Sequence, residues 1–102
     1  MATNKVSLQG DVCTGHGCFP PRQNSSWSSS VYVNGLPVHR QYDDWSPHGC
    51  SNCPPHSSRL AMGSANVYVE GKQLGRQHDP VECGSKVQGP CSADVFAGDF
   101  GG

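Results

Sequence analysis

Residues 31–40 read VYVNGLPVHR, and this stretch has the pattern of a tight β-hairpin. Valine and tyrosine, which favour strands, stand directly before Asn34-Gly35. Asn-Gly is the strongest short-range hairpin signal, because a two-residue type I′ turn needs positive φ at both central positions. The alternation predicts that Val31 and Val33 point to one face of the strand and Tyr32 to the other.

The same pattern returns 36 residues later in the chain. Residues 67–79, VYVEGKQLGRQHD, are identical to residues 31–43 at seven of thirteen positions. Self-similarity at a fixed period indicates repeated structural units. The sequence therefore predicts a second hairpin of the same shape.

A third copy is divided between the two ends of the chain. Residues 94–98, DVFAG, resemble the outgoing strand, with Gly98 at its turn. Alignment of Asp11 with Asp43 then makes the N-terminal residues the missing return strand. Three hairpins that close on themselves predict an all-β fold with pseudo-threefold symmetry.

The composition is lean in residues that build a core. The 102 residues include 13 Gly, 8 Pro and 13 Ser, whereas Leu, Val and Phe total 17 and Ile is absent. Such a core would not by itself offset the conformational entropy of the chain, on the order of 150 kcal/mol. The six Cys and five His could supply further stabilisation by binding metal or forming disulfides. The length fits one domain, residues 1–102, and we expect no extension domain.

Charge and hydropathy exclude several classes of protein. Residues 1–10 contain no apolar h-region, so we expect no signal peptide. No apolar run approaches the ~20 residues of a membrane-spanning helix. The net charge is −1 and the basic residues are scattered, which argues against a nucleic-acid face. Cysteines in a chain without a secretory signal are metal ligands more often than disulfides.

A residue that can bind a metal ion follows the aspartate that ends each copy, four or five positions on. The pairs are Asp11 with His16, Asp43 with His48, and Asp79 with Cys83. Pseudo-threefold symmetry would bring these three side chains together near the axis. His56 is the best fourth candidate, and a His₃Cys set leaves no position for water. The spacing thus predicts one structural, tetrahedral zinc site.

Other thiols and imidazoles leave alternatives open. Cys50 and Cys53 form a CxxC, which is a zinc pair in some proteins and a redox pair in others. The weaker candidates are Cys13, Cys18, Cys91, His39 and His78. Cys91 is interpreted as a small buried hydrophobe, and the last two as surface or packing histidines.

Catalytic signatures are absent from the sequence, so we expect no enzyme and no small-molecule substrate. There is no HExxH, P-loop or G-x-S-x-G sequence. Two further hypotheses concern other classes. One is a zinc-binding adaptor module for protein or nucleic acid, built around the CxxC loop. The other is a disulfide-stapled module that is exported without a signal peptide.

These motifs together resemble the PAAR-motif family, the spike-tip proteins of type VI secretion systems and contractile phage tails. The resemblance covers nearly the whole chain. Residues 37–40, PVHR, occupy the Pro-Ala-Ala-Arg signature, which becomes QLGR at residues 73–76. The other matching stretches are residues 10–11, 14–22, 31–36, 63–64, 79–80 and 83–85.

The resemblance implies a small cone of β-hairpins with a zinc ion near its apex, held by three His and one Cys. By motif position the ligands are His16, His48, His56 and Cys83, with Cys50 or Cys53 as competitors for His56. It implies that one tip caps the blunt end of a trimeric β-helical spike, VgrG-like or a phage central spike, and contacts the target membrane transiently. The expected location is a phage tail tip, or the bacterial cytoplasm before export in the secretion apparatus.

Overall fold

The chain folds into short antiparallel strands joined by tight turns, seen in a computed structural model that describes residues 3–16, 19–50 and 53–98; the side chains of residues 48–57 lie outside that description. Five two-stranded sheets occur among the described residues, and no helix does. The strands are β1 (Thr3–Lys5), β2 (Val12–Cys13), β3 (Tyr32–Val33), β4 (Leu36–Pro37), β5 (Asp44–Cys50), β6 (Cys53–Arg59), β7 (Tyr68–Val69), β8 (Lys72–Gln73), β9 (Val87–Gly89) and β10 (Phe96–Gly98).

Two hairpins form where the repeat predicts them. β3 pairs with β4 and β7 pairs with β8 in equivalent registers. In the first turn Asn34 and Gly35 have φ of 54° and 81°. In the second turn Glu70 and Gly71 have φ of 55° and 82°. Both turns are therefore left-handed at both central positions, as a type I′ turn requires.

The two ends of the chain form the third hairpin, which confirms the prediction from the divided repeat. β1 pairs with β10, and Asn4 lies opposite Ala97. The prediction for Gly98 was wrong, because this residue lies in β10 opposite Thr3 rather than at a turn. The reason is that pairing between the two ends continues where the other hairpins turn, so the register puts Gly98 at the place of Asn34.

Backbone hydrogen bonds join the three hairpin units in a closed ring. Ser7 N–H donates to the carbonyl of Gly75 at 2.9 Å, Gly75 donates to His39 at 2.8 Å, and His39 donates to Ser7 at 2.9 Å. A second set follows two residues on: Gln9 to Pro37, Gln41 to Gln73, and Gln77 to Lys5. Each unit is thus held by both neighbours, and the buried backbone groups along the contact are satisfied.

The aspartate that ends each unit holds the same type of turn. A side-chain oxygen of Asp11, Asp43 and Asp79 accepts the N–H three residues earlier, at 2.8 Å in every case. The donors are Leu8, Arg40 and Arg76 respectively. The repeated Asp is therefore a structural requirement of the turn.

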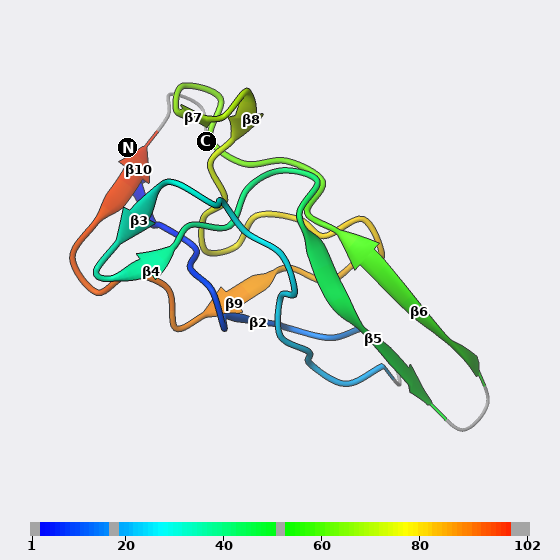
Figure 1. Ribbon diagram of the computed structural model, residues 1–102. Coiled ribbons are helices and arrows are strands. Elements are labelled where there is room, and N and C mark those ends of the chain that lie inside the picture. Colours follow the sequence, from blue (N-terminus) through cyan, green and yellow to red (C-terminus); the bar gives the residue numbers. More distant parts are fainter. Residues whose placement is uncertain (1–2, 17–18, 51–52, 99–102) are drawn as a thin grey trace.

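The buried apolar side chains form two small cores. The first lies beneath the hairpins and contains Val6, Leu8, Val38, Val69, Leu74 and Ala97. The second contains Cys13, Trp45, Leu60, Val81, Val87 and Cys91. Figure 1 shows the three hairpins gathered at one end of the molecule, with the long β5–β6 hairpin extending away from them. The fold consequently has two distinct ends.

Candidate functional site

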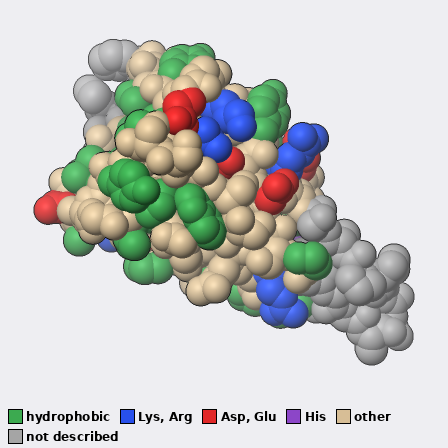
Figure 2. Space-filling model, viewed as in Figure 1, with side chains coloured by type: hydrophobic (Ala, Val, Ile, Leu, Met, Phe, Trp, Pro, Cys, Tyr) green, Lys and Arg blue, Asp and Glu red, His purple; other side chains and the backbone are tan. Residues whose placement is uncertain are grey.

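The three hairpins expose apolar side chains at equivalent positions. Val31, Val67 and Val95 are each 37% exposed, and the residues that follow them, Tyr32, Tyr68 and Phe96, are 57%, 57% and 51% exposed. We call these six residues the hairpin face. Figure 2 shows several hydrophobic side chains on the surface at the hairpin end of the molecule. Large apolar residues repeated on one surface are typical of a binding face, because isolated ones are ordinary but clustered ones are not.

Neighbouring positions on the same hairpins have diverged between the copies. Leu36 is 41% exposed, yet the equivalent residues of the other units are Lys72 and Asn4. The first two turns likewise carry Asn34 and Glu70 at one position. Exposed positions on the hairpins can therefore differ between the copies. The similarity of the residues in the hairpin face needs a separate explanation.

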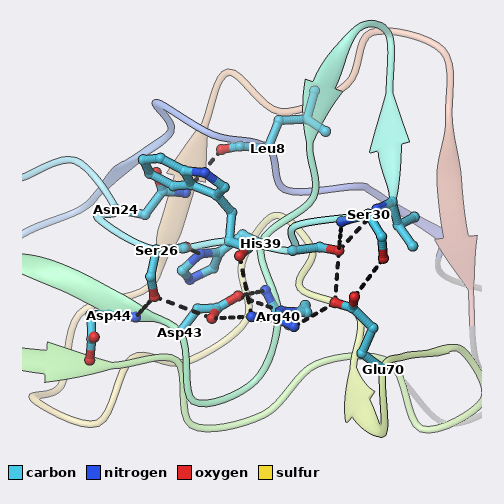
Figure 3. Close-up of polar contacts among 12 residues, drawn as sticks. Leu8, Asn24, Ser26, Ser30, His39, Arg40, Asp43, Asp44 and Glu70 are labelled. Atoms are coloured by element: carbon cyan, nitrogen blue, oxygen red, sulfur yellow. Dashed lines mark hydrogen bonds and ion pairs between the residues drawn. The ribbon is translucent and has the colours of Figure 1, made fainter.

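A charged network fixes the second hairpin to the first unit. Arg40 donates to both oxygens of Asp43 at 2.9 Å and to Glu70 Oε1 at 2.6 Å (Figure 3). Ser28 donates to the same Glu70 oxygen at 2.8 Å, and Ser30 donates to the other oxygen. The hydrogen bond that Arg40 donates to Asp43 is the main reason that the pKa of Arg40 is raised. The hydrogen bonds from Ser30 and Ser28, followed by the charge of Arg40, hold the pKa of Glu70 below its ordinary value.

A link without an ion pair holds the first hairpin to the third unit. Asn34 at its turn accepts a hydrogen bond from Ser92, and its amide donates to Asp94 at 3.0 Å. Ser28, Ser64 and Ser92 occupy equivalent places, since each hydroxyl accepts backbone N–H bonds from the residues two and three positions on. The hairpins are therefore held laterally as well as through the backbone ring.

His39 lies inside the molecule with no exposed surface, which confirms that it is a packing histidine. Its Nδ1 donates to the carbonyl of Ser26 at 2.9 Å, and its ring lies edge-on to Trp45 with centroids 5.0 Å apart. The Nε2 of His39 and the Nε1 of Trp45 have no hydrogen-bond partner among the described residues. Desolvation lowers the pKa of His39 to about 4, so the ring is neutral at pH 7.

The segments that carry the predicted zinc ligands approach one another on the side of the second core. Thr14 and Lys86 exchange hydrogen bonds of 2.8 and 3.0 Å, which places the segment before His16 beside the one after Cys83. Glu82 N–H donates to Arg59 at 2.9 Å, so β6 also lies beside the Cys83 segment. In the pairing of β5 with β6, His48 lies opposite His56 and Cys50 opposite Cys53.

The described residues do not by themselves form a metal site. Among the side chains that the structure describes, which do not include those of residues 48–57, no group of three or more His, Cys, Asp and Glu could hold a metal ion. The His16 ring stacks on Phe19 with centroids 4.8 Å apart, and the sulfur of Cys83 lies 3.5 Å from the hydroxyl of Ser85. The side chains of His48, His56, Cys50 and Cys53 lie outside the described residues. Imidazole and thiolate remain the donors that zinc prefers, and the backbone brings their segments together.

Two of the remaining cysteines are buried in the second core. Cys13 and Cys91 are free thiols, 2% and 9% exposed, and Cys83 packs against the same cluster. Burial, together with the nearby charge of Asp11, raises the pKa of the Cys91 thiol. These features confirm the interpretation of Cys91 as a buried hydrophobe. Cys18 lies outside the described residues.

Sequence analysis missed the links between hairpins. Glu70 bonds to Ser30, 40 positions away, and Asn34 bonds to Asp94, 60 positions away. Turn positions are commonly polar for reasons of turn geometry, so their side chains gave no signal of a distant partner. The one available signal was that this single turn position carries Asn34 in one copy and Glu70 in the other.

The fold and this site define a small all-β protein with three hairpin units, an exposed apolar face at one end and clustered His and Cys segments away from it. The PAAR motif matches residues 4–89 of the 102-residue chain. The chain therefore belongs to the PAAR-motif family, a structural spike-tip family. Comparison with curated proteins gives no match. Across the described part of the chain there is no helix with the length and hydrophobicity to cross a bilayer.

Proposed function

We propose that this chain is the structural tip of a membrane-piercing spike and that the hairpin face caps the blunt end of a trimeric β-helical spike protein. The observation that carries the proposal is the equal exposure of three Val and three aromatic residues on hairpins joined in a closed ring. One monomer can match a threefold partner only if it presents near-equivalent contacts three times. PAAR membership gives independent support for the spike as the partner.

The arrangement of the units supports pseudo-threefold symmetry. The ring through Ser7, His39 and Gly75 repeats one hydrogen bond three times, always from one unit to the next in the same sense. The Asp-capped turns and the serine motifs repeat with it. We infer that the axis passes through this ring and that the molecule narrows from the hairpin face towards the other end, as a small cone.

We propose one structural zinc ion near the narrow end, held by His16, His48, His56 and Cys83. Two observations support this set. His48 and His56 are register partners, and directly opposed residues in an antiparallel pair are close neighbours. Backbone bonds also bring the segments of His16 and Cys83 side by side. When bound, the ion would connect loops that the two small hydrophobic cores stabilise only weakly. Structural zinc contributes about 10–16 kcal/mol of apparent folding free energy in small domains.

The function is mechanical, so we expect no catalysis. A blunt trimer that is driven against a bilayer spreads the force over its whole end, whereas a cone concentrates it. The expected location follows from the partner: the tip of a phage tail, or the bacterial cytoplasm followed by export in the secretion apparatus. Membrane contact would be brief.

Two measurements test this proposal. Purified protein mixed with β-helical spike trimers should form a complex of one tip per trimer by native mass spectrometry. Metal analysis should give about one zinc ion per chain. A folded chain without metal would contradict the zinc site, and a stoichiometry of three tips per trimer would contradict the capping geometry.

A zinc-binding adaptor built around Cys50 and Cys53 is the alternative, and their opposed positions in the β5–β6 pairing favour it. The two zinc sites differ in their response to mutation. The adaptor requires that Cys50→Ser and Cys53→Ser abolish zinc binding while His16→Ala does not. The tip predicts loss of zinc in His16→Ala.

A further inference from the structure

In a complex with a threefold partner, each of the three hairpins contacts an equivalent partner surface, but the hairpins differ in some of their side chains. This reasoning rests on the proposed function, in which the partner has threefold symmetry. Identical partner chains present identical groups to all three hairpins. The three residues at equivalent positions of the tip therefore all have to fit the same group on the partner. Their shared chemistry shows what that part of the spike end can accept.

The aromatic position combines two phenols with one phenyl ring. Tyr32 and Tyr68 are equally exposed, and Phe96 is nearly as exposed without a hydroxyl. A partner group dedicated to hydrogen bonding the tyrosine hydroxyl would be buried without a partner against Phe96. Such a buried unsatisfied group costs about 1–3 kcal/mol. The three aromatic rings are consequently best accepted by a site that contacts the ring and leaves its para position in water.

The position after the turn shows the opposite behaviour. Leu36, Lys72 and Asn4 are equivalent there, and they are apolar, cationic and amide-bearing. A tight apolar contact would have to desolvate the ammonium group of Lys72, and a carboxylate placed for Lys72 would be left facing Leu36. The partner surface opposite this position must therefore remain hydrated and make no specific contact.

The valine position has the same residue in all units and the same exposure. Val31, Val67 and Val95 are each 37% exposed. A branched aliphatic side chain gives only shape and apolar area to a contact. Each valine lies opposite a residue of the first core, as Val31 does through the bond from Val38 N–H to its carbonyl. Its side chain is therefore on the face of the strand opposite to the aromatic ring.

We infer that the spike end presents three identical apolar sockets, each of which receives one aromatic ring of the hairpin face without hydrogen bonding to a tyrosine hydroxyl, next to a hydrated position that tolerates any residue. The occupant of the hairpin face is thus an apolar threefold end and not a charged one. The three aromatic residues therefore determine which spikes fit, and Leu36, Lys72 and Asn4 do not.

The test uses the full-length tip with its zinc and the purified C-terminal β-helix trimer of the spike protein from the same genome, with the dissociation constant measured by calorimetry. Tyr32→Phe, Tyr68→Phe and Phe96→Tyr should each change it less than about 2-fold. Tyr32→Ala, Tyr68→Ala and Phe96→Ala should each weaken binding about 10- to 30-fold, in the range of anchor residues. Met62→Ala is the matched control, because Met62 is 53% exposed and lies outside the three hairpins; it should leave binding unchanged.

Two exchanges test the hydrated position. Leu36→Lys and Lys72→Leu should each change the dissociation constant less than about 3-fold, far below the effect of the alanine variants. A loss of about 10-fold or more in Tyr32→Phe or Tyr68→Phe, or in either exchange, would overturn the inference while the tip still binds. Failure of the unchanged protein to bind the trimer, or formation of dimers through the hairpin face instead, would overturn the spike-tip proposal and the inference with it.

Discussion

The three aspartates at equivalent positions allow one substitution to be made in three electrostatic settings. Asp79 accepts from the backbone N–H of Arg76 and from its guanidinium at 3.1 and 2.9 Å, and both side chains of this ion pair are less than one-tenth exposed. Asp79→Asn removes the negative charge and keeps the shape. Water cannot replace the carboxylate beside the guanidinium in an ion pair this deeply buried, and removal of one partner from such a pair costs about 3–5 kcal/mol. We expect a loss of unfolding free energy in that range.

The other two copies serve as matched controls. In Asp43→Asn the guanidinium of Arg40 keeps Glu70 as a second carboxylate at 2.6 Å, so the expected loss is smaller, about 1–3 kcal/mol. Asp11 has Leu8 in place of an arginine, and its carboxylate accepts from Ser7 and from the N–H of Cys91. Asp11→Asn leaves no cation behind, so the expected loss is again about 1–3 kcal/mol, that of one lost buried hydrogen bond.

Urea denaturation at pH 7, followed by circular dichroism and tryptophan fluorescence, measures the three variants against the unchanged protein. The expected result is that Asp79→Asn loses clearly more stability than either of the other two variants. Equal losses for all three variants would refute the electrostatic reasoning and assign the effect to the turn alone. A loss below about 1 kcal/mol for Asp79→Asn would show that the Arg76 ion pair contributes little in net terms.

Three further predictions concern other parts of the molecule. Because the pKa of His39 is lowered from 6.5 to about 4, the unfolded chain binds the proton more readily, so stability is fully present above pH 6.5 and falls by about 3 kcal/mol towards pH 4; His39→Asn, whose amide can still donate to Ser26, should flatten unfolding free energy against pH in that window, and an unchanged slope would contradict it. Glu70→Gln should lower the thermal midpoint at low salt and less at high salt, since the Arg40–Glu70 pair is partly exposed and screened; a shift independent of salt would count against the ion pair. Gly75→Ala should cost about 1–3 kcal/mol or more in urea unfolding, because the added Cβ would lie 2.8 Å from the carbonyl of His39; a variant as stable as the unchanged protein would contradict that close approach.

The hairpins were predictable because their information is local. Asn34-Gly35 and the repeated Val-Tyr-Val require no knowledge of distant residues, and the divided third hairpin followed from register alone. The face assignment within the strand was predictable from alternation. Val33 packs against the first core, and Val31 lies opposite the core residue Val38, whose N–H donates to its carbonyl. Tyr32 between them is 57% exposed.

The exposed residues of the hairpin face were not assigned from the sequence, and the links between units were not predicted at all. The difference is one of sequence distance. Contacts such as Glu70 with Ser30 join hairpin turns to neighbouring units, and only the closed arrangement of the units brings them together. The proposed ligands His16, His48, His56 and Cys83 were selected by repeat position and spacing, which predict a metal site without fixing the geometry of its side chains.

Divergence among the three copies separates what the fold requires from what a partner requires. The residue whose N–H donates to the Asp-capped turn is Leu8 in one unit and Arg40 or Arg76 in the others. The charge beside the aspartate therefore differs between the units. The residue in the ring of backbone hydrogen bonds likewise differs, since it is Ser7, His39 or Gly75. Buried positions with such freedom show that internal packing alone does not keep the copies alike. The aromatic residues of the hairpin face are more than half exposed, so packing constrains them least, and the proposed contact with three identical chains would account for the type that they have kept.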